Sequence, residues 1–346
     1  MSRRQLGIFL GLVAMAASGV GLSSPGVAEA SSGPYAPLNG PNPPLEVPTA
    51  QLAASLSCTS GLTDASHDPV LLVPGTALNP TDNYSWNYEL GLTALGLPWC
   101  ALTLPDNAMG DIATAGQYVV YAILTMHHES GQRVDILGYS QGGMVPRWAL
   151  RFWPETRPLV ASFVAIDPSN HGTLDAWAAC QVVCPPSFWQ QATGSQFLAA
   201  LNSYAETFAG IDYTIIYSRT DEVVLPNFNS EGSSALHTGS GTILNLAVQQ
   251  VCPADVSEHL LMGTVDPVAY ALAIDALTHN SLANPADAPA SLCTEGLSPP
   301  TNPVTFPVHF ASMLASIGAA IATSPETSSE PPLPSYVYAH SSTVRT

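Results

Sequence analysis

Lysine is absent from this sequence of 346 residues, so its eight basic residues are all arginine. They are opposed by 26 acidic residues, and the formal net charge is −18 at pH 7. Nucleic acids and anionic membranes carry charge of the same sign, so this composition argues against both as partners. Charged residues make up only 10% of the chain, compared with the usual ~25%. Much of the surface must therefore be neutral or apolar.

The sequence also lacks the spacings that bind metals, since it contains no Cys-x-x-Cys and no His-Glu-x-x-His motif. We therefore expect neither a metal nor another cofactor. The N-terminus has Arg3 and Arg4, an apolar stretch over 6–20 and small residues at 28–30, which is the order of a secretory signal peptide. We expect a secreted protein that is cleaved after about Ala30, with no stable membrane span. Six cysteines in an oxidising compartment favour disulfides, and Cys180 and Cys184 are the nearest pair.

Composition divides the rest of the chain into three parts. Residues 31–51 are rich in proline, serine and glycine and predict an extended arm, and residues 324–346 form a similar tail. Between them, residues 52–323 are long enough for one domain, which we expect to be a monomer. Its C-terminal segment, residues 308–323, is apolar but short for a membrane span, and we interpret it as an amphipathic or buried helix.

Short apolar runs alternate with helical patterns along this domain. Helices are predicted over 112–127 and 144–152, and strands over 70–73, 134–137, 159–166, 213–217 and 243–251. Such alternation indicates an α/β fold with a mostly parallel sheet and helices on both faces.

The motif Gly138-Tyr139-Ser140-Gln141-Gly142 lies between the strand at 134–137 and the helix at 144–152. This is the context of a nucleophile elbow, in which a tight turn lifts a serine hydroxyl clear of the backbone. Ser140 is therefore the candidate nucleophile. The amide of Gln141 faces the same space, where it can bind a developing oxyanion.

A serine nucleophile needs a histidine to take its proton and an acid to orient that histidine. Two acids follow strands after the elbow, Asp167 and Asp221, and we favour Asp221 because it lies one strand later in a polar turn. The candidate histidines are His171, His237, His259 and His279. His259 is favoured because it follows the 243–251 strand by a short loop. Thr76, which ends the first strand, is the second candidate oxyanion donor.

Four motifs together resemble the lipase B type of Candida antarctica, in register from about residue 52 to 338. They are Leu71–Thr76, Ser140–Gly143, Ser187–Ser195 and Tyr217–Val223. The resemblance implies an α/β-hydrolase fold and the cleavage of carboxylic esters without a cofactor. It also implies a triad of Ser140, Asp221 and His259, with Thr76 and Gln141 as oxyanion donors.

The same resemblance implies a substrate pocket and two disulfides, Cys58–Cys100 and Cys252–Cys293. The pocket residues are Gly75, Tyr139, Asp167, Gln191 and Val223. Tyr139 stands where the family has a tryptophan. Cys180 and Cys184 fall in the segment that corresponds to a short mobile helix over the site, so a bridge between them would limit its motion.

The sequence therefore predicts a secreted serine lipase or carboxylesterase that acts on lipid or other apolar esters. A cutinase-like polyesterase or an acyltransferase would use the same three residues with a different substrate or acyl acceptor. A non-catalytic cell-surface binding protein on a retired hydrolase fold is a third alternative, against which the intact serine, acid and histidine argue.

Overall fold

A computed structural model describes residues 35–339 of the chain. The expected signal peptide, residues 1–30, and the last residues of the tail, 340–346, lie outside the described part.

The centre of the fold is a seven-stranded sheet with the strand order β1-β3-β2-β4-β5-β6-β7. Only β1 is antiparallel to its neighbour, β3, and all other pairs are parallel. The strands are β1 Leu56–Cys58, β2 Val70–Val73, β3 Trp99–Leu102, β4 Val134–Tyr139, β5 Val160–Ile166, β6 Asp212–Tyr217 and β7 Thr242–Ala247. The expected mostly parallel α/β sheet is thus confirmed.

The central strands β2, β4 and β5 are buried along their whole length, as continuous apolar runs in a parallel sheet require. Their alternate side chains enter two separate apolar cores. Leu71 and Ile136 face the core on one side of the sheet, whereas Leu72 and Leu137 face the core on the other. Helices therefore cover both faces.

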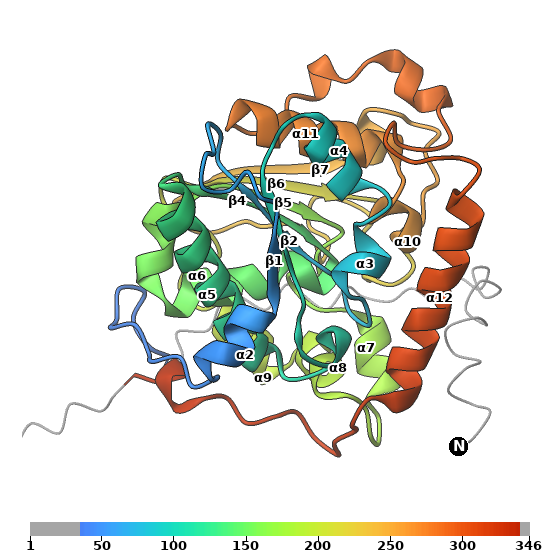
Figure 1. Cartoon of the computed structure of the whole chain (residues 1–346). Coiled ribbons are helices and arrows are strands. Elements are labelled where there is room, and N and C mark those ends of the chain that lie inside the picture. The colour runs from blue at the N-terminus through green and yellow to red at the C-terminus, as the bar shows by residue number, and fades with distance from the viewer. Residues whose placement is uncertain (1–34, 340–346) are drawn as a thin grey trace, which may run out of the picture.

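Figure 1 shows α5 and α6 on one side of the sheet and α4 and α11 on the other. The long helix α5 begins after Asp111, whose side chain caps it, and ends at Gly131 in a left-handed conformation. The α-helices of the described chain are α2 Thr49–Ala54, α3 Pro80–Asn83, α4 Tyr88–Ala94, α5 Ile112–Ser130, α6 Val145–Phe152, α7 Leu174–Ala179, α8 Pro186–Gln191, α9 Gln196–Leu201, α10 His259–Met262, α11 Pro267–His279 and α12 Phe306–Thr323.

Helix α12 differs from its prediction in length and in burial. It has 18 residues and begins at Phe306, and its side chains are exposed or half-buried except for Met313 and Ala320, which are buried. The alternative of a buried helix is therefore wrong. By length and composition alone, α12 can cross a membrane, and so can the mostly buried stretch His259–His279. Core helices of soluble proteins meet the same criteria.

The sheet also corrects the sequence-based strands. The strand expected over 243–251 ends at Ala247, because the chain turns into a 3₁₀ helix, Val248–Gln250. The short strands β1 and β3 were not predicted. Three residues are too few for a period to be visible, and β3 follows a proline-containing turn.

The arm and the tail pack on the domain and on each other. The backbone amide of Ala36 donates to the carbonyl of Val337, and the indole of Trp153 donates to the carbonyl of Pro43. In the tail, the carboxylate of Glu330 accepts hydrogen bonds from the amides of Gln196 and Phe197 at the start of α9. The described parts of both segments are therefore held by specific bonds. The arm runs into the start of α2, and the tail contains a 3₁₀ turn, Ser335–Val337.

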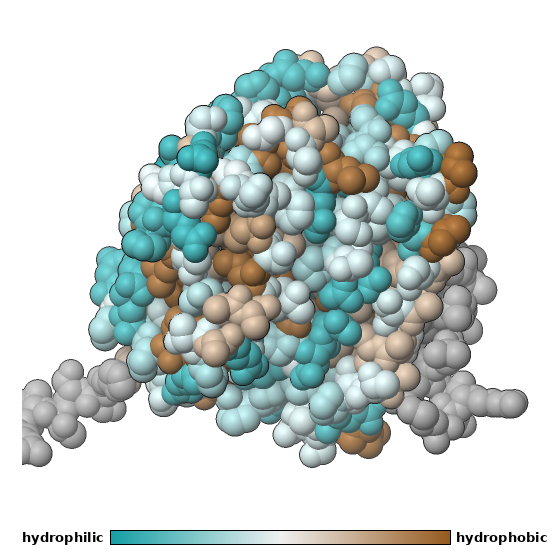
Figure 2. Space-filling view, in the orientation of Figure 1, coloured by the Kyte–Doolittle hydropathy of each residue, from teal (hydrophilic) through white to brown (hydrophobic). Residues whose placement is uncertain are grey.

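All six cysteines are paired in the structure, as Cys58–Cys100, Cys180–Cys184 and Cys252–Cys293. The surface seen in Figure 2 is a patchwork in which hydrophobic residues interrupt the hydrophilic ones in several places. This agrees with the low content of charged residues.

Candidate active site

The turn after β4 holds Ser140 in a conformation that few residues adopt, with φ of 53°. Strand β4 passes directly into a 3₁₀ turn, Ser140–Gly143, and then into α6. The turn leaves no room for side chains beside it. A Cβ on Gly142 would lie 2.0 Å from the carbonyl oxygen of Val73, and one on Gly138 would lie 2.1 Å from the carbonyl oxygen of Gly142. The two glycines thus allow the sharp turn that exposes the serine hydroxyl.

The imidazole of His259 lies between Ser140 and Asp221. Its Nε2 is 3.0 Å from Ser140 Oγ, and its Nδ1 is 2.9 Å from Asp221 Oδ2. All three residues are buried, with relative exposures of 6% or less. Ser140 and Asp221 are 119 and 38 positions from His259 in the sequence, and the fold brings all three together.

The loop after β6 holds the carboxylate of Asp221 in place. Asp221 Oδ1 accepts hydrogen bonds from the amides of Val223 and Val224, both at 2.8 Å. The hydroxyls of Ser218 and Thr220 donate to the carbonyl of Ser257, at 2.7 and 2.9 Å. These bonds tie the loop that carries the acid to the loop that carries His259.

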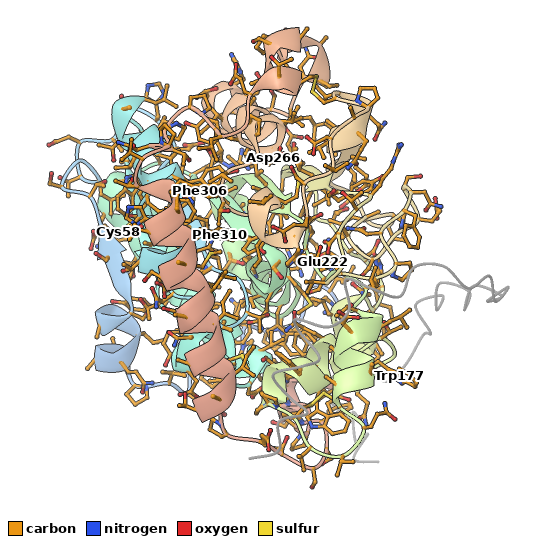
Figure 3. All side chains as sticks on the ribbon, turned by 90° about the vertical axis from the view of Figure 1, so that its right-hand side faces the viewer. Cys58, Trp177, Glu222, Asp266, Phe306 and Phe310 are labelled. Carbon is orange, nitrogen blue, oxygen red and sulfur yellow. A yellow bond between two sulfur atoms is a disulfide. The ribbon has the colours of Figure 1, made fainter. Side chains whose placement is uncertain are left out.

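Several carboxyl groups surround the histidine. Burial lowers the pKa of His259, but the charge of Asp221 and its hydrogen bond, with Glu222 and Glu258, outweigh burial and raise the pKa above its ordinary value. Burial, followed by the charge of Asp221, raises the pKa of Asp175 to about 6. Figure 3 shows Glu222 on the face between α12 and the segment that carries Trp177. The site is therefore rich in acidic groups and has its base stabilised in the charged form.

Thr76 and Gln141, the candidate oxyanion donors, lie in contact beside the elbow. Gln141 Nε2 donates to the Thr76 hydroxyl at 3.1 Å and to the carbonyl of Ala108 at 2.9 Å. Gln191 Nε2 also donates to the Thr76 hydroxyl at 3.1 Å. The hydroxyl of Thr76 in turn donates a long hydrogen bond to Gln191 Oε1 at 3.4 Å, so its proton has an acceptor in this network.

Gly75 and Tyr139 lie behind the site and support it. A Cβ on Gly75 would be 2.9 Å from the ring of Tyr139, so only glycine fits there. Its amide donates to the side chain of Asn83 at 3.1 Å, and Asn83 in turn donates to the carbonyl of Gly263. Tyr139 is 2% exposed, and its place in the substrate pocket stays a prediction. Asn83 was not predicted, because nothing in its short segment marks it.

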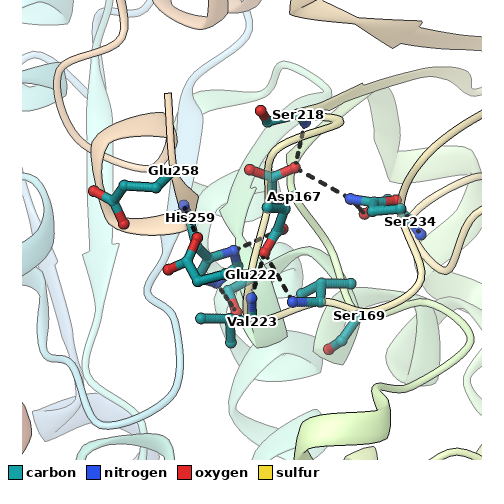
Figure 4. Close-up of polar contacts among 12 residues, drawn as sticks. Asp167, Ser169, Ser218, Glu222, Val223, Ser234, Glu258 and His259 are labelled. Carbon is teal, nitrogen blue, oxygen red and sulfur yellow. Dashed lines mark hydrogen bonds and ion pairs between the residues drawn. The ribbon is translucent and has the colours of Figure 1, made fainter. Parts of the chain in front are cut away.

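Asp167 is fully buried beside the candidate triad, since ligand atoms of Asp167, Asp221 and His259 lie within 4.8 Å of one another. Its place in the substrate pocket stays a prediction. Its Oδ1 accepts a hydrogen bond from the amide of Ser218 at 2.7 Å (Figure 4). It also accepts a long hydrogen bond from Asn227 at 3.4 Å. The hydroxyl of Ser169, two residues later, donates to Gln191 at 2.9 Å. Gln191 thus contacts the hydroxyls of both Thr76 and Ser169, and the sequence did not single out the serine.

The other candidate histidines lie away from Ser140 and are bound elsewhere. His171 pairs with Glu206 at 2.6 Å and stacks on His237, while the exposed His279 pairs with Asp275 at 3.0 Å.

Ligand atoms of Asp167, Asp221 and His259 lie within 4.8 Å of one another, which is close enough for a metal. Both ring nitrogens of His259 are already engaged with Asp221 and Ser140. The residues therefore fit a proton-transfer chain better than a metal site.

The fold and the site together define an α/β-hydrolase. Residues 117–256 match a family model described as lipase (class 2). Over 215 residues the chain is 33% identical to lipase B of Pseudozyma antarctica. The aligned region covers 60% of this chain and 61% of that protein. The match thus spans less than two thirds of that relative.

The crystal structure of Aspergillus fumigatus lipase B is similar over a longer part of the chain. It superimposes with a TM-score of 0.78 at 30% identity, covering 86% of this chain and 74% of that one. The chain belongs to the lipase B family.

Proposed function

We propose that this protein is a secreted serine ester hydrolase that cleaves the carboxylic ester bonds of lipids or of other apolar esters. The observation that carries the proposal is the hydrogen-bonded chain from Ser140 Oγ through His259 to Asp221, with both distances near 3 Å. Membership in the lipase B family supports the reaction class. The three disulfides support secretion.

In the first half of the reaction, Ser140 Oγ attacks the ester carbon while His259 Nε2 takes the hydroxyl proton. The carbonyl oxygen becomes negative and is stabilised by donors from Thr76 and Gln141. When the intermediate collapses, His259 gives the proton to the leaving alcohol, and the acyl group stays on Ser140. Water then repeats these steps, which releases the acid and restores the serine.

The negative charge of Asp221 and of the neighbouring acidic groups stabilises His259 when it is protonated during the reaction. The carboxylate of Asp221 holds the imidazole by its Nδ1 and stabilises the positive charge that His259 acquires. Asp175, Glu222 and Glu258 act on the histidine or on its carboxylate partner. This acidic surrounding favours neutral esters over anionic ones, because a negative substrate would be repelled.

The test compares Ser140→Ala with Ser162→Ala in hydrolysis of a neutral p-nitrophenyl ester. Ser140→Ala should lose activity by a factor on the order of 10⁴ or more, with its unfolding temperature preserved. Ser162 is a matched control, since it is also buried and its hydroxyl has no hydrogen-bond partner. A serine-reactive phosphonate should label the parent and Ser162→Ala but not Ser140→Ala. Activity of Ser140→Ala within tenfold of the parent would refute the proposal.

A further inference from the structure

Asp167 is a second buried carboxyl group beside the candidate triad, and the mechanism above does not use it. It follows β5, at the same end of the sheet where Asp221 follows β6. One ligand atom each of Asp167, Asp221 and His259 lie within 4.8 Å of one another. The backbone of Asp167 has a φ of 41°, a strained conformation for a residue other than glycine.

The two carboxyl oxygens of Asp167 differ in their hydrogen bonding. Oδ1 accepts the amide of Ser218 at 2.7 Å, whereas Oδ2 is buried and has no hydrogen-bond partner. A carboxylate oxygen without a donor is costly in a buried site, because it has lost its water and gained nothing. An oxygen that carries a proton avoids this cost and becomes a donor to a neighbouring acceptor.

Negative or acidic groups face Asp167 from several elements. Asp221 and Glu222 lie in the loop after β6, and Asp266 precedes α11. His259 at the start of α10 and Tyr139 at the end of β4 are the other titratable groups nearby. Burial, followed by the charge of Asp221, raises the pKa of Asp167 well above its ordinary value.

We propose that Asp167 is a positioning residue that stays a neutral carboxylic acid at neutral pH, with its Oδ2 proton directed at Asp221. The inference rests on the proposed function and deepens it. Two ionised carboxyl groups this close would repel each other, and together they would raise the pKa of His259 so far that it could not act as a base. A neutral Asp167 leaves one negative charge to orient the histidine, and its donor restrains the carboxylate that does so.

The decisive measurement is the pH profile of kcat/KM for the parent, Asp167→Asn and Asp167→Ala. The acid limb reports the pKa of His259 in the free enzyme. Asparagine copies the neutral acid, so Asp167→Asn should keep the position of the acid limb and retain kcat to within about threefold. Asp167→Ala loses the donor, and its kcat should fall by about tenfold or more with KM little changed.

The opposite result is equally specific. If Asp167 were ionised in the parent, Asp167→Asn would remove a negative charge within 4.8 Å of the histidine. The acid limb would then move to lower pH by about two units. Such a shift, or equal kcat for Asp167→Asn and Asp167→Ala, would overturn the proposal.

A second measurement does not need an active enzyme. In the full-length Ser140→Ala background, the low-field NMR resonance of the His259 Nδ1 proton reports its bond to Asp221. Adding Asp167→Asn should leave this resonance in place, and adding Asp167→Ala should move or broaden it. If both additions leave it unchanged, Asp167 does not position Asp221. Because an active Ser140→Ala variant would refute the proposed function instead, the two failures are distinguishable.

Discussion

The hydroxyl of Tyr139 donates to the backbone carbonyl of His259 at 3.0 Å, and the two rings lie 5.0 Å apart. The residue that precedes the candidate nucleophile thus holds the backbone of the candidate base. In the sequence, Tyr139 is notable because it stands where the family has a tryptophan. The structure shows that its buried phenol joins the elbow to the start of α10.

Tyr139→Phe tests this connection, since it removes only the hydroxyl. We expect a loss of about 1 kcal/mol in unfolding free energy, because the carbonyl of His259 loses its buried donor. The kcat should fall by about three- to tenfold, since the histidine backbone is less restrained. Urea unfolding and ester kinetics measure both effects. Tyr217→Phe is the control, as another buried tyrosine on the sheet, and should leave kcat near the parent value. A Tyr139→Phe variant with parental kcat and stability would contradict the role.

Asp221→Asn and His259→Ala should each lower kcat/KM by a factor on the order of 10⁴, because one removes the charge that stabilises the imidazolium and the other removes the base. Asp167→Asn should be much less damaging than Asp221→Asn. Steady-state kinetics on one short-chain ester decide the order. If Asp167→Asn proved the more damaging of the two, the acid of the triad would be Asp167.

Sequence reasoning succeeded for the residues whose roles are local. The elbow around Ser140 needs glycines at fixed positions and a strand before it, and both are visible in the chain. The parallel sheet was also predictable, because continuous apolar runs of four to eight residues are typical of doubly covered strands.

What the sequence could not show are relations set by the packing of distant segments. Asp167 and Ser169 are two residues apart, yet one side chain faces Ser218 and the other faces Gln191. The tight backbone turn at Asp167, with positive φ, sets these directions, and no pattern in the chain predicts it. The exposed position of α12 is a similar case, since an apolar helix of this composition is usually buried.

Glu206 provides a test of stability against pH away from the site. Its carboxylate accepts hydrogen bonds from the His171 ring at 2.6 Å and from the amides of His237 and Thr238 at 2.7 and 2.8 Å. Burial raises the pKa of Glu206, but His171 and the charge of Arg147 outweigh it, and the net pKa lies well below its ordinary value of 4.5. The folded state thus keeps this carboxyl ionised where the unfolded chain binds a proton. Its stabilisation is present above about pH 4.5 and is lost progressively as the pH falls below that value.

Glu206→Gln should therefore destabilise the protein by about 1–3 kcal/mol at pH 7, because the neutral amide cannot accept all of these bonds. The difference from the parent should shrink as the pH falls from 4.5 to 3. Urea midpoints across this range measure it, with Glu231→Gln, an exposed acid, as the control. A difference that stays constant between pH 7 and pH 3 would show that charge is not what Glu206 contributes.

The last prediction concerns the segment that carries the Cys180–Cys184 disulfide. The Cys180–Cys184 disulfide closes a short loop after α7, and the backbone of Cys184 exchanges two hydrogen bonds with Thr327 in the tail, at 3.1 and 2.9 Å. Thr173, just before α7, donates to the carbonyl of Val223 beside Asp221. The segment is thus fixed at the site by one end and to the tail by the other.

Replacing both cysteines, as Cys180→Ala with Cys184→Ala, should free this segment while costing little global stability, since the closed loop is short. Because the segment is anchored beside Asp221, we expect its release to affect the entry of bulky esters more than that of small ones. The ratio of kcat/KM for a long-chain ester to that for an acetate should therefore change by about threefold or more. Removing the Cys58–Cys100 bridge in the same way is the control. It joins β1 to β3 and closes a longer loop, because its two cysteines are separated by 42 residues in the sequence. That variant should lose more stability and leave the ester ratio unchanged. An unchanged ratio in the Cys180/Cys184 variant would mean that the bridge does not restrain the entry of substrate.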